Sequence, residues 1–296
     1  MKDEASLVVQ GSSGRTVGPP GRNVANPLRG VSTSAPFVLL SPAQAGSACR
    51  SPLACGRLLG IERRTGRTAV WDACHDRGVS TVYDTSRPDG RQAGLATAAN
   101  AVRAGGLVVL PTDTVYGIGA DAFDPSAVAA LLSAKGRGRD MPVPVLVGSW
   151  STVDGLVRSV PKQARSLIEA FWPGGLSIVL PQAPSLTWDL GNTRGTVNLR
   201  MPLHPVALDL LREVGPMAVS SANSSGNSPA ITADDARQQL GEAVSVYLDG
   251  GPCGEPVAST IVDFTQAQPR VLREGAVGLA ELSEVMGIEL AATHAE

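Results

Sequence analysis

Hydroxyl, amide and basic side chains gather in three short segments of this chain, each directly after an apolar run or a helical stretch. Pro111–Gly117 reads PTDTVYG, Lys135–Arg139 reads KGRGR, and Ser220–Gly226 reads SSANSSG. The planar guanidinium of arginine donates two parallel hydrogen bonds to an anion. Serine, asparagine and glycine at the end of a strand can form a concave nest of backbone N–H groups that binds phosphate. The three segments therefore predict a site that holds a phosphate compound.

Two further arginines extend this predicted anion site. Arg200 ends an apolar run, and Arg273 accompanies Ser259 and Thr260 near the C-terminus. Together with the KGRGR segment they account for five of the fifteen Lys and Arg residues after Val79. Structural alternatives exist, because cations suit the C-terminal end of a helix and because Ser, Asn and Gly favour ordinary turns. Gathered in one cleft, however, the five cations would attract an anionic substrate.

Other kinds of chemistry lack the residues they need. The sequence contains no Walker A motif and no G-x-G-x-x-G after a predicted strand. Its three histidines are His75, His204 and His294, and His204 precedes Pro205, where we expect it to begin a helix. These histidines provide neither a Ser-His-Asp triad nor a zinc site. We therefore expect the site to position and neutralise a phosphate compound without covalent catalysis.

Apolar runs and helical periods alternate through about 200 residues, which favours one α/β domain with a covered sheet. In such folds ligands bind at the loops beyond the strand ends. The predicted helices are Ala93–Ala104, Pro125–Ser133, Lys162–Phe171, Pro205–Val214, a short one capped by Thr232, and Gly278–Met286. The predicted strands are Leu107–Leu110, Val143–Val147, Leu176–Leu180, Thr196–Leu199, Met217–Ser220, Ser245–Leu248, Thr260–Val262 and Arg270–Leu272.

The composition of the 296-residue chain changes before Val79. Residues 1–78 hold ten Lys and Arg against five Asp and Glu, and they are rich in Gly, Pro and Ser. Residues 79–296 hold fifteen against twenty-two, which gives a net charge of −7. We expect residues 1–78 to be a disordered extension; the alternative is that the protein naturally begins at Val79. No apolar stretch approaches the roughly 20 residues that span a bilayer, so we expect a cytoplasmic protein.

Seven motifs, in order, resemble those of the YrdC-like family of L-threonylcarbamoyladenylate synthases, in its short, actinobacterial form. The family reads PT-D/E-T-x-YG-L/I, K-x-R, WPGPLT, R-x-P-x-HP, SAN-x-SG, ST-x-VD and LR-x-G. The corresponding segments are Pro111–Ile118, Lys135–Arg137, Trp172–Ser177, Arg200–Pro205, Ser221–Gly226, Ser259–Asp263 and Leu272–Gly275. Each motif alone is weakly specific, but seven in register are a specific signature.

The resemblance implies a fold, a reaction and partners. The fold would be a single domain over residues 79–296, with a twisted, open, mixed sheet and helices around a basic concave cleft. The reaction would join L-threonine, bicarbonate and ATP into threonylcarbamoyl-AMP and release pyrophosphate, with Mg²⁺ held mainly by the ATP phosphates. The product would pass to a complex that transfers the threonylcarbamoyl group to tRNA, forming N6-threonylcarbamoyladenosine. Neither membrane association nor stable nucleic-acid binding is expected.

The resemblance also implies roles for nine residues. Two would be catalytic and neutralise the ATP phosphates: Lys135 and Arg137. Four more would hold the nucleotide: Thr196, Ser221, Asn223 and Arg273. Threonine would contact Thr114, Arg200 and Ser259, with Arg200 pairing its carboxylate. A site built to bond the threonine hydroxyl would reject valine, because valine leaves those polar groups unpaired.

The chain departs from the family pattern in two motifs. Leu146 stands where many members have a histidine, which puts a threonine contact at that position in question. The WPGPLT motif reads WPGGLS, a mild change at an expected turn. The chain ends at residue 296, shortly after Gly275, so we do not expect the extra C-terminal domain of the longer members.

Two other functions could use the same basic cleft. An RNA-binding module would use its basic residues, but the net charge of −7 after Val79 and the 4% aromatic content argue against this class. The carbamoyl-adenylate step of hydrogenase maturation is a related chemistry. Proteins that perform it are much longer and carry acylphosphatase and zinc-finger segments that this sequence lacks.

Overall fold

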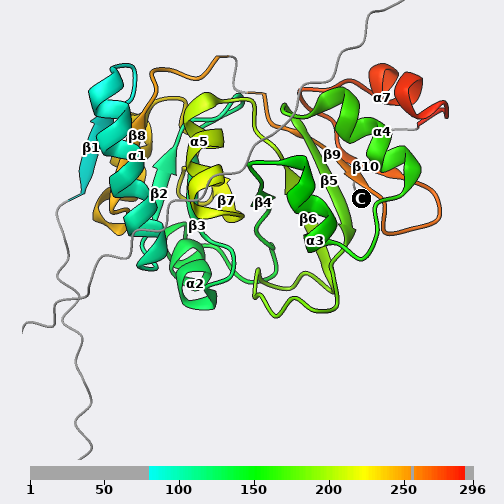
Figure 1. Ribbon diagram of the computed structural model, residues 1–296, viewed down its shortest axis with the longest axis horizontal. Coiled ribbons are helices and arrows are strands. Elements are labelled where there is room, and N and C mark those ends of the chain that lie inside the picture. Colours follow the sequence, from blue (N-terminus) through cyan, green and yellow to red (C-terminus); the bar gives the residue numbers. More distant parts are fainter. Residues whose placement is uncertain (1–79, 255–256, 291–296) are drawn as a thin grey trace, which may run out of the picture. The chain divides into compact units, whose positions relative to one another are not determined.

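The computed structural model describes residues 80–254 and 257–290, and in this part of the chain one mixed sheet forms the centre of the fold (Figure 1). Its ten strands lie in the order β1-β8-β2-β3-β7-β4-β6-β5-β9-β10. The bounds are β1 Thr81–Asp84, β2 Val108–Leu110, β3 Gly117–Asp121, β4 Val145–Leu146, β5 Leu176–Pro181, β6 Thr196–Arg200, β7 Met217–Ser221, β8 Val246–Asp249, β9 Thr260–Asp263 and β10 Arg270–Arg273. The predicted extension, residues 1–78, lies outside the described residues.

Seven α-helices surround this sheet in the described ranges. They are α1 Pro88–Arg103, α2 Pro125–Ala134, α3 Val153–Leu156, α4 Lys162–Phe171, α5 Pro205–Val214, α6 Ala233–Leu240 and α7 Leu279–Met286. Two short 3₁₀ turns accompany them, at Trp150–Thr152 and Gly241–Ala243. The expected class, a mixed α/β domain with an open sheet and flanking helices, is confirmed.

The sheet is covered on both faces at β2, where every residue is apolar. Val108 and Leu110 belong to a core cluster under α1 and α5, and Leu107 and Val109 belong to a larger cluster on the opposite face. Successive residues of a strand point to opposite faces, so a continuous apolar run is what a strand buried on both faces requires. The predicted strand at Leu107–Leu110 and the covered sheet are therefore confirmed.

Around β5 and β6 the pattern changes, and this change positions the site. Val197 and Leu199 of β6 belong to the larger core, whereas Asn198 and Arg200 line a cavity on the other face. On β5, Ser177 also lines the cavity, between core residues. The face that α1 and α5 cover at one end of the sheet thus becomes a polar cavity floor towards β5, β6 and β9.

The predicted helices and strands agree with the structure apart from shifts of their ends, the largest at the start of α1, one missed short helix, α3, and two missed strands. Asp124 caps α2 by accepting hydrogen bonds from the N–H groups of Ser126 and Ala127, at 2.8 and 3.2 Å. Thr232 caps α6 through the N–H of Asp235, at 3.0 Å. His204 occupies the N-cap position of α5, as expected of a residue that begins a helix. The sequence did not indicate β1 or β3.

Strand β3 contains two glycines, Gly117 and Gly119, and lies between β2 and β7. Gly117 also lines the cavity of the site. A Cβ at Gly117 would meet Val219 at 2.6 Å, and one at Gly119 would meet Met217 at 2.7 Å. These glycines therefore allow the β7 side chains to pack across β3.

Candidate active site

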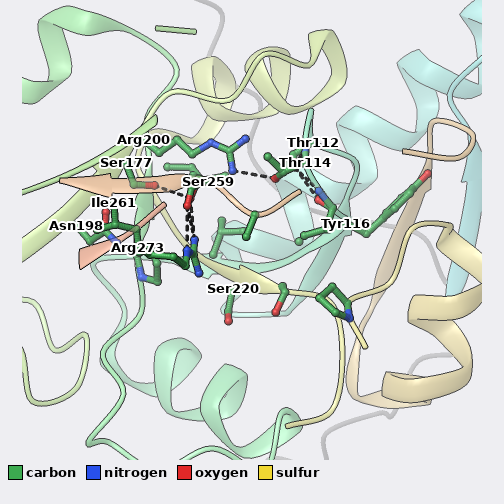
Figure 2. Close-up of a pocket in the computed structure, with 18 of the residues that line it drawn as sticks. Thr112, Thr114, Tyr116, Ser177, Asn198, Arg200, Ser220, Ser259, Ile261 and Arg273 are labelled. Carbon is green, nitrogen blue, oxygen red and sulfur yellow. Dashed lines mark hydrogen bonds between the residues drawn. The ribbon is translucent and has the colours of Figure 1, made fainter. Parts of the chain in front are cut away.

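A cavity of about 330 Å³ opens on the exposed part of the sheet face (Figure 2). Seven hydroxyl-bearing side chains, one amide and three guanidinium groups line it. Among the described lining residues the only charged ones are Arg137, Arg200 and Arg273. Three cations without a carboxylate in the same lining give a site suited to an anion.

The Arg200 guanidinium is held rigidly at one side of the cavity. Its Nη1 donates to Thr114 Oγ1 at 3.0 Å, its Nη2 to Asp113 Oδ1 at 2.7 Å, and its Nε to the Gly174 carbonyl at 2.9 Å. The same Asp113 oxygen accepts the backbone N–H of Leu203 at 2.8 Å. The Arg200 side chain is only 8% exposed, so this is a buried, oriented ion pair. Three of its five N–H groups are used, which leaves two for a ligand.

Arg273 and two serines form a second group beside Arg200 (Figure 2). Arg273 Nε and Nη2 donate to the Ser259 carbonyl at 2.9 and 2.8 Å, and Nη2 also reaches Ser259 Oγ at 3.0 Å. Ser259 Oγ and Ser177 Oγ lie 2.9 Å apart. Burial, and then the positive charge of Arg200, lower the pKa of Arg273. A bound anion would relieve this repulsion, which favours an acidic ligand at this point.

Arg137 provides the third cation, from the turn after α2. Its Nη1 donates to Ser220 Oγ, at the end of β7, at 3.2 Å. Burial lowers the pKa of Arg137, because desolvation disfavours the charged form, and the negative charge of Asp140 offsets this shift only in part. The turn that carries it follows a helix, as the sequence suggested. The side chain nevertheless reaches the cavity and does more than complement the helix end.

Lys135 lies directly behind the cavity, where its Nζ holds the SSANSSG segment. It donates to the backbone carbonyls of Ser221 and Asn223, the second at 2.7 Å, and its side chain is buried. The Lys135 carbonyl in turn accepts the N–H of Ser225 at 2.8 Å. Burial, and then the nearby Arg137, lower the pKa of Lys135 to about 8. In this structure Lys135 therefore joins two segments of the site without itself lining the cavity.

The SSANSSG segment presents side chains to the cavity, and its backbone does not form a free nest. The N–H groups of residues 222–225 donate in order to the Tyr116 carbonyl, the Ser221 carbonyl, Gln239 Oε1 and the Lys135 carbonyl. These four N–H groups, which a nest would offer to phosphate, therefore already have acceptors. Ser220 and Ser221 line the cavity, so hydroxyls are what this segment offers.

The structure brings together six of the nine residues given a role by the sequence. The six that line the cavity are Thr114, Arg137, Arg200, Ser221, Ser259 and Arg273. Lys135, Thr196 and Asn223 do not line it. Thr196 bonds the Thr193 carbonyl at 2.8 Å at the start of β6, and Asn223 donates to the Asn227 carbonyl at 2.8 Å. Leu146, at the position of the family histidine, lines the cavity as an apolar residue.

Two polar residues of the cavity escaped the sequence interpretation, Ser177 and Asn198. A signal for Asn198 was present, because Thr196, Asn198 and Arg200 alternate with Val197 and Leu199. Alternation of this kind places the three polar residues on one face of a strand. This alternation was enough to predict Asn198 as a further candidate residue of the site.

Several known proteins are similar to this chain in sequence. A relative from Mycobacterium tuberculosis H37Rv, provisionally named threonylcarbamoyl-AMP synthase, is 64% identical over 213 residues, which are 72% of this chain and 98% of the relative. A threonylcarbamoyl-AMP synthase from Bacillus subtilis is 37% identical over 195 residues, covering 65% of this chain and 56% of that protein.

Solved structures show the same fold. The crystal structure of Pyrococcus abyssi Sua5 complexed with L-threonine matches with a TM-score of 0.64 and 36% identity, over 67% of this chain and 58% of that one. The Escherichia coli YciO structure, at 23% identity and a TM-score of 0.60, covers 69% and 98% and supports the fold alone. A family model for Sua5, YciO and YrdC, described as "Telomere recombination", matches residues 100–275. The chain therefore belongs to the Sua5/YciO/YrdC family.

Proposed function

We propose that this protein is an L-threonylcarbamoyladenylate synthase, which condenses L-threonine, bicarbonate and ATP to threonylcarbamoyl-AMP and pyrophosphate. The observation that carries the proposal is the cavity in which Arg137, Arg200 and Arg273 are the only charged lining residues described, among seven hydroxyl groups. Relatives named for this activity match the chain, one of them over 98% of its own length. Such a cavity suits a substrate pair that brings several negative charges together.

The proposed chemistry needs no nucleophile from the protein. The threonine amine combines with bicarbonate to give a carbamate and water. A carbamate oxygen then attacks the α-phosphorus of ATP, and the bond to the bridging oxygen of the β-phosphate breaks, so that pyrophosphate leaves. Both reactants are anions, and the site must hold them in contact against their repulsion. The three guanidinium groups, with Lys135 behind them, supply the positive field for this task.

The threonine end of the site is proposed at Thr114, Arg200 and Ser259. Two N–H groups of the fixed Arg200 guanidinium remain for a carboxylate, and Asp113 keeps that guanidinium in place. Two linked hydroxyls, Ser177 and Ser259, could bond the threonine side chain. Valine would leave such hydroxyls unpaired, so it should be a poor substrate.

Magnesium is proposed to enter with ATP. Within residues 80–254 and 257–290, no group of three His, Cys, Asp or Glu side chains could hold a metal ion. Mg²⁺ commonly keeps several waters and binds through substrate phosphates, and this mode fits a cavity lined by arginines and hydroxyls. When bound, the ion would offset charge on the triphosphate, and the protein's own part would be to bind and orient the phosphates.

The destination of the product is proposed from its chemistry. Threonylcarbamoyl-AMP is a reactive mixed anhydride, so a second enzyme complex would transfer its acyl group to tRNA as N6-threonylcarbamoyladenosine. No helix within the described part of the chain is long and apolar enough to cross a membrane. A tRNA-directed role would place the protein in the cytoplasm.

A coupled assay of pyrophosphate release tests the proposal. With ATP and Mg²⁺, release should require both L-threonine and bicarbonate, and valine should not replace threonine. Arg137→Ala should reduce the rate by two orders of magnitude or more, because it removes a cation from the phosphate site. Pyrophosphate release at equal rates with and without threonine would refute the proposal.

The alternative, an RNA-binding module, is separated by a different measurement. Binding through the three arginines would give an affinity for RNA that falls steeply with salt. We expect no measurable RNA binding at physiological salt, since the described surface includes few aromatic side chains for base stacking and residues 79–296 carry a net charge of −7. Tight, salt-dependent binding without threonine-dependent pyrophosphate release would favour the alternative.

A further inference from the structure

Arg139 is the cation of the KGRGR segment that forms an ion pair, and it does not line the cavity. The sequence had grouped it with the cations of the anion site. In the structure its Nη2 instead donates to Asp189 Oδ1 at 2.6 Å, in the loop between β5 and β6. The two side chains are 56% and 39% exposed, so the pair itself adds little to the stability of the fold. Its role is therefore to be sought in the segment that it holds in place.

Residues 137–144, here called the cavity wall, close one side of the cavity. Arg137, Pro142 and Pro144 all belong to its lining. Arg137 stands between two glycines, and the first of them, Gly136, has a left-handed backbone with φ of 61°. Glycine gives a backbone the greatest conformational freedom. The cavity wall therefore needs an anchor outside the turn to keep Arg137 in one position.

The loop between β5 and β6 provides this anchor. Within the described part of the chain, every hydrogen bond from residues 138–143 to another segment goes to one short stretch of this loop. The Val143 N–H donates to the Leu190 carbonyl at 3.0 Å. The Arg139 carbonyl accepts the N–H of Asn192 at 2.7 Å. The ion pair thus lies beside two backbone hydrogen bonds that join the same two segments.

The loop has a local structure that fits it to the cavity wall. Asp189 Oδ1, which accepts from Arg139, also accepts the Gly191 N–H at 3.2 Å. Gly191 has φ of 97°, and a Cβ there would meet the Arg139 carbonyl oxygen at 2.9 Å. The neighbouring Trp188 ring stacks on Phe123, just before α2, with their centroids 5.4 Å apart. The loop is therefore attached to the cavity wall and also to the body of the protein.

We infer that Arg139 and Asp189 are positioning residues, which hold the cavity wall so that Arg137 faces the phosphates of the nucleotide. This inference rests on the proposed function and names residues that act on its phosphate site from outside. Neither residue lines the cavity, and no described residue from Pro181 to Thr196 does. Breaking the ion pair should therefore weaken nucleotide binding and leave the threonine end of the site unaffected.

The test measures nucleotide binding and kinetics on the full-length protein. The probe is α,β-methylene-ATP with Mg²⁺, whose α–β bridge cannot be cleaved, titrated calorimetrically without threonine. Arg139→Ala and Asp189→Ala should each raise its Kd about fivefold, within the coupling found between groups in contact. The double variant should bind no more weakly than either single one, because each removes the same bond. KM for threonine, measured by pyrophosphate release, should not change.

Two further comparisons separate positioning from other effects. In Arg137→Ala no guanidinium remains to be positioned, so adding Asp189→Ala should leave the Kd of the probe unchanged. Asp154→Ala breaks a matched ion pair with Arg165, also at 2.6 Å and with side chains 57% and 40% exposed. This control should alter neither the Kd nor the KM for threonine. All these losses of an exposed ion pair should leave the urea midpoint of unfolding nearly unchanged.

Several results would overturn the inference. An unchanged Kd in both single variants would show that the ion pair positions nothing. A Kd that rises in Arg139→Ala and falls in Asp189→Ala would show that Arg139 binds phosphate directly. A full further loss on adding Asp189→Ala to Arg137→Ala would mean that the pair does not act through Arg137. A lower urea midpoint, with equal losses for nucleotide and threonine, would show a general structural role.

The proposed function is tested separately, by threonine-dependent pyrophosphate release from the wild type. Binding of the probe is measured without threonine and without turnover. Failure of the inference is therefore distinguishable from failure of the proposed function.

Discussion

At the scale of single residues, the site is built from cations whose charge is only partly compensated. Arg200 has Asp113 as a buried partner, whereas Arg137 and Arg273 bond hydroxyl and carbonyl oxygens. The pKa of both is lowered by burial, and that of Lys135 falls to about 8 for the same reason. Cations fixed in this way by the protein are already oriented for an anionic substrate, and the effect of their charge on activity can be tested directly.

The first prediction concerns pH. Lys135 is a cation below its pKa of about 8 and becomes neutral above it, so kcat/KM for ATP should fall as the pH rises through about 8. This quantity reports ionisations of the free enzyme. In Lys135→Arg the charge persists to far higher pH, and the falling limb should move upward with it. Profiles measured from pH 6 to 10 that fall at the same point in both proteins would assign the limb to another group.

The second prediction concerns Arg200. Lysine keeps the positive charge but loses the planar fork that bonds Thr114, Asp113 and Gly174 at once. Arg200→Lys should therefore raise KM for threonine about tenfold or more and change KM for ATP much less. Steady-state kinetics with each substrate varied in turn provide the measurement. A rise confined to KM for ATP would place Arg200 at the nucleotide.

At the scale of elements, α2 and β7 deliver the phosphate side of the site. Helix α2 ends where Lys135 begins the turn that carries Arg137, and β7 ends in the segment that Lys135 holds. The start of this helix is fixed by Asp124, whose carboxylate accepts two backbone N–H groups. The elements themselves thus bring cations and hydroxyls together.

The third prediction separates this support from chemistry. Asp124→Ala removes the cap of α2 and should lower the free energy of unfolding by about 1 kcal/mol, with little change in kcat/KM. Urea denaturation and steady-state kinetics together provide the check, with Ser126→Ala as a matched substitution in the same turn. A large loss of activity at unchanged stability would mean that Asp124 acts in the site.

The same elements show what a sequence can and cannot predict. Lys162–Phe171 and Pro205–Val214 were predicted with the ends the structure gives, because periodic apolar residues and prolines at or before the first turn define them locally. Strand β3, which reads GIGAD, has little intrinsic strand preference and is a strand because it pairs with β2 and β7. Lys135 lies behind the cavity because its side chain bonds the SSANSSG segment, which is distant in the sequence. The K-x-R spacing of Lys135 and Arg137 alone could not predict this position.

At the scale of the whole molecule, the site lies on the part of one sheet face that helices α1 and α5 do not cover. Helices α1 and α5 cover this face near β2 and β8, and the face continues towards β5, β6 and β9 as the floor of the cavity. Leu146 and Val219 belong both to the core under these helices and to the cavity lining. The folded core and the binding site therefore share a boundary. The predicted extension before Val79 lies outside the described residues.

The fourth prediction concerns that extension. A protein that starts at Val79 should keep the pyrophosphate-release rate and the melting temperature of the full chain, because every residue assigned to the site lies after it. Thermal melts and the coupled assay on both proteins make the comparison. A drop in either quantity would show that residues 1–78 contribute to the fold or to the site.

The central claim is that the cavity joins threonine, bicarbonate and ATP, and incorporation of labelled carbon tests it most directly. The protein is incubated with ¹⁴C-bicarbonate, L-threonine, ATP and Mg²⁺, and the nucleotides are separated chromatographically. We predict a labelled product that contains AMP, forms only when threonine is present, and is lost in Arg137→Ala. An adenylated product without label, or a labelled one that forms equally without threonine, would contradict the account.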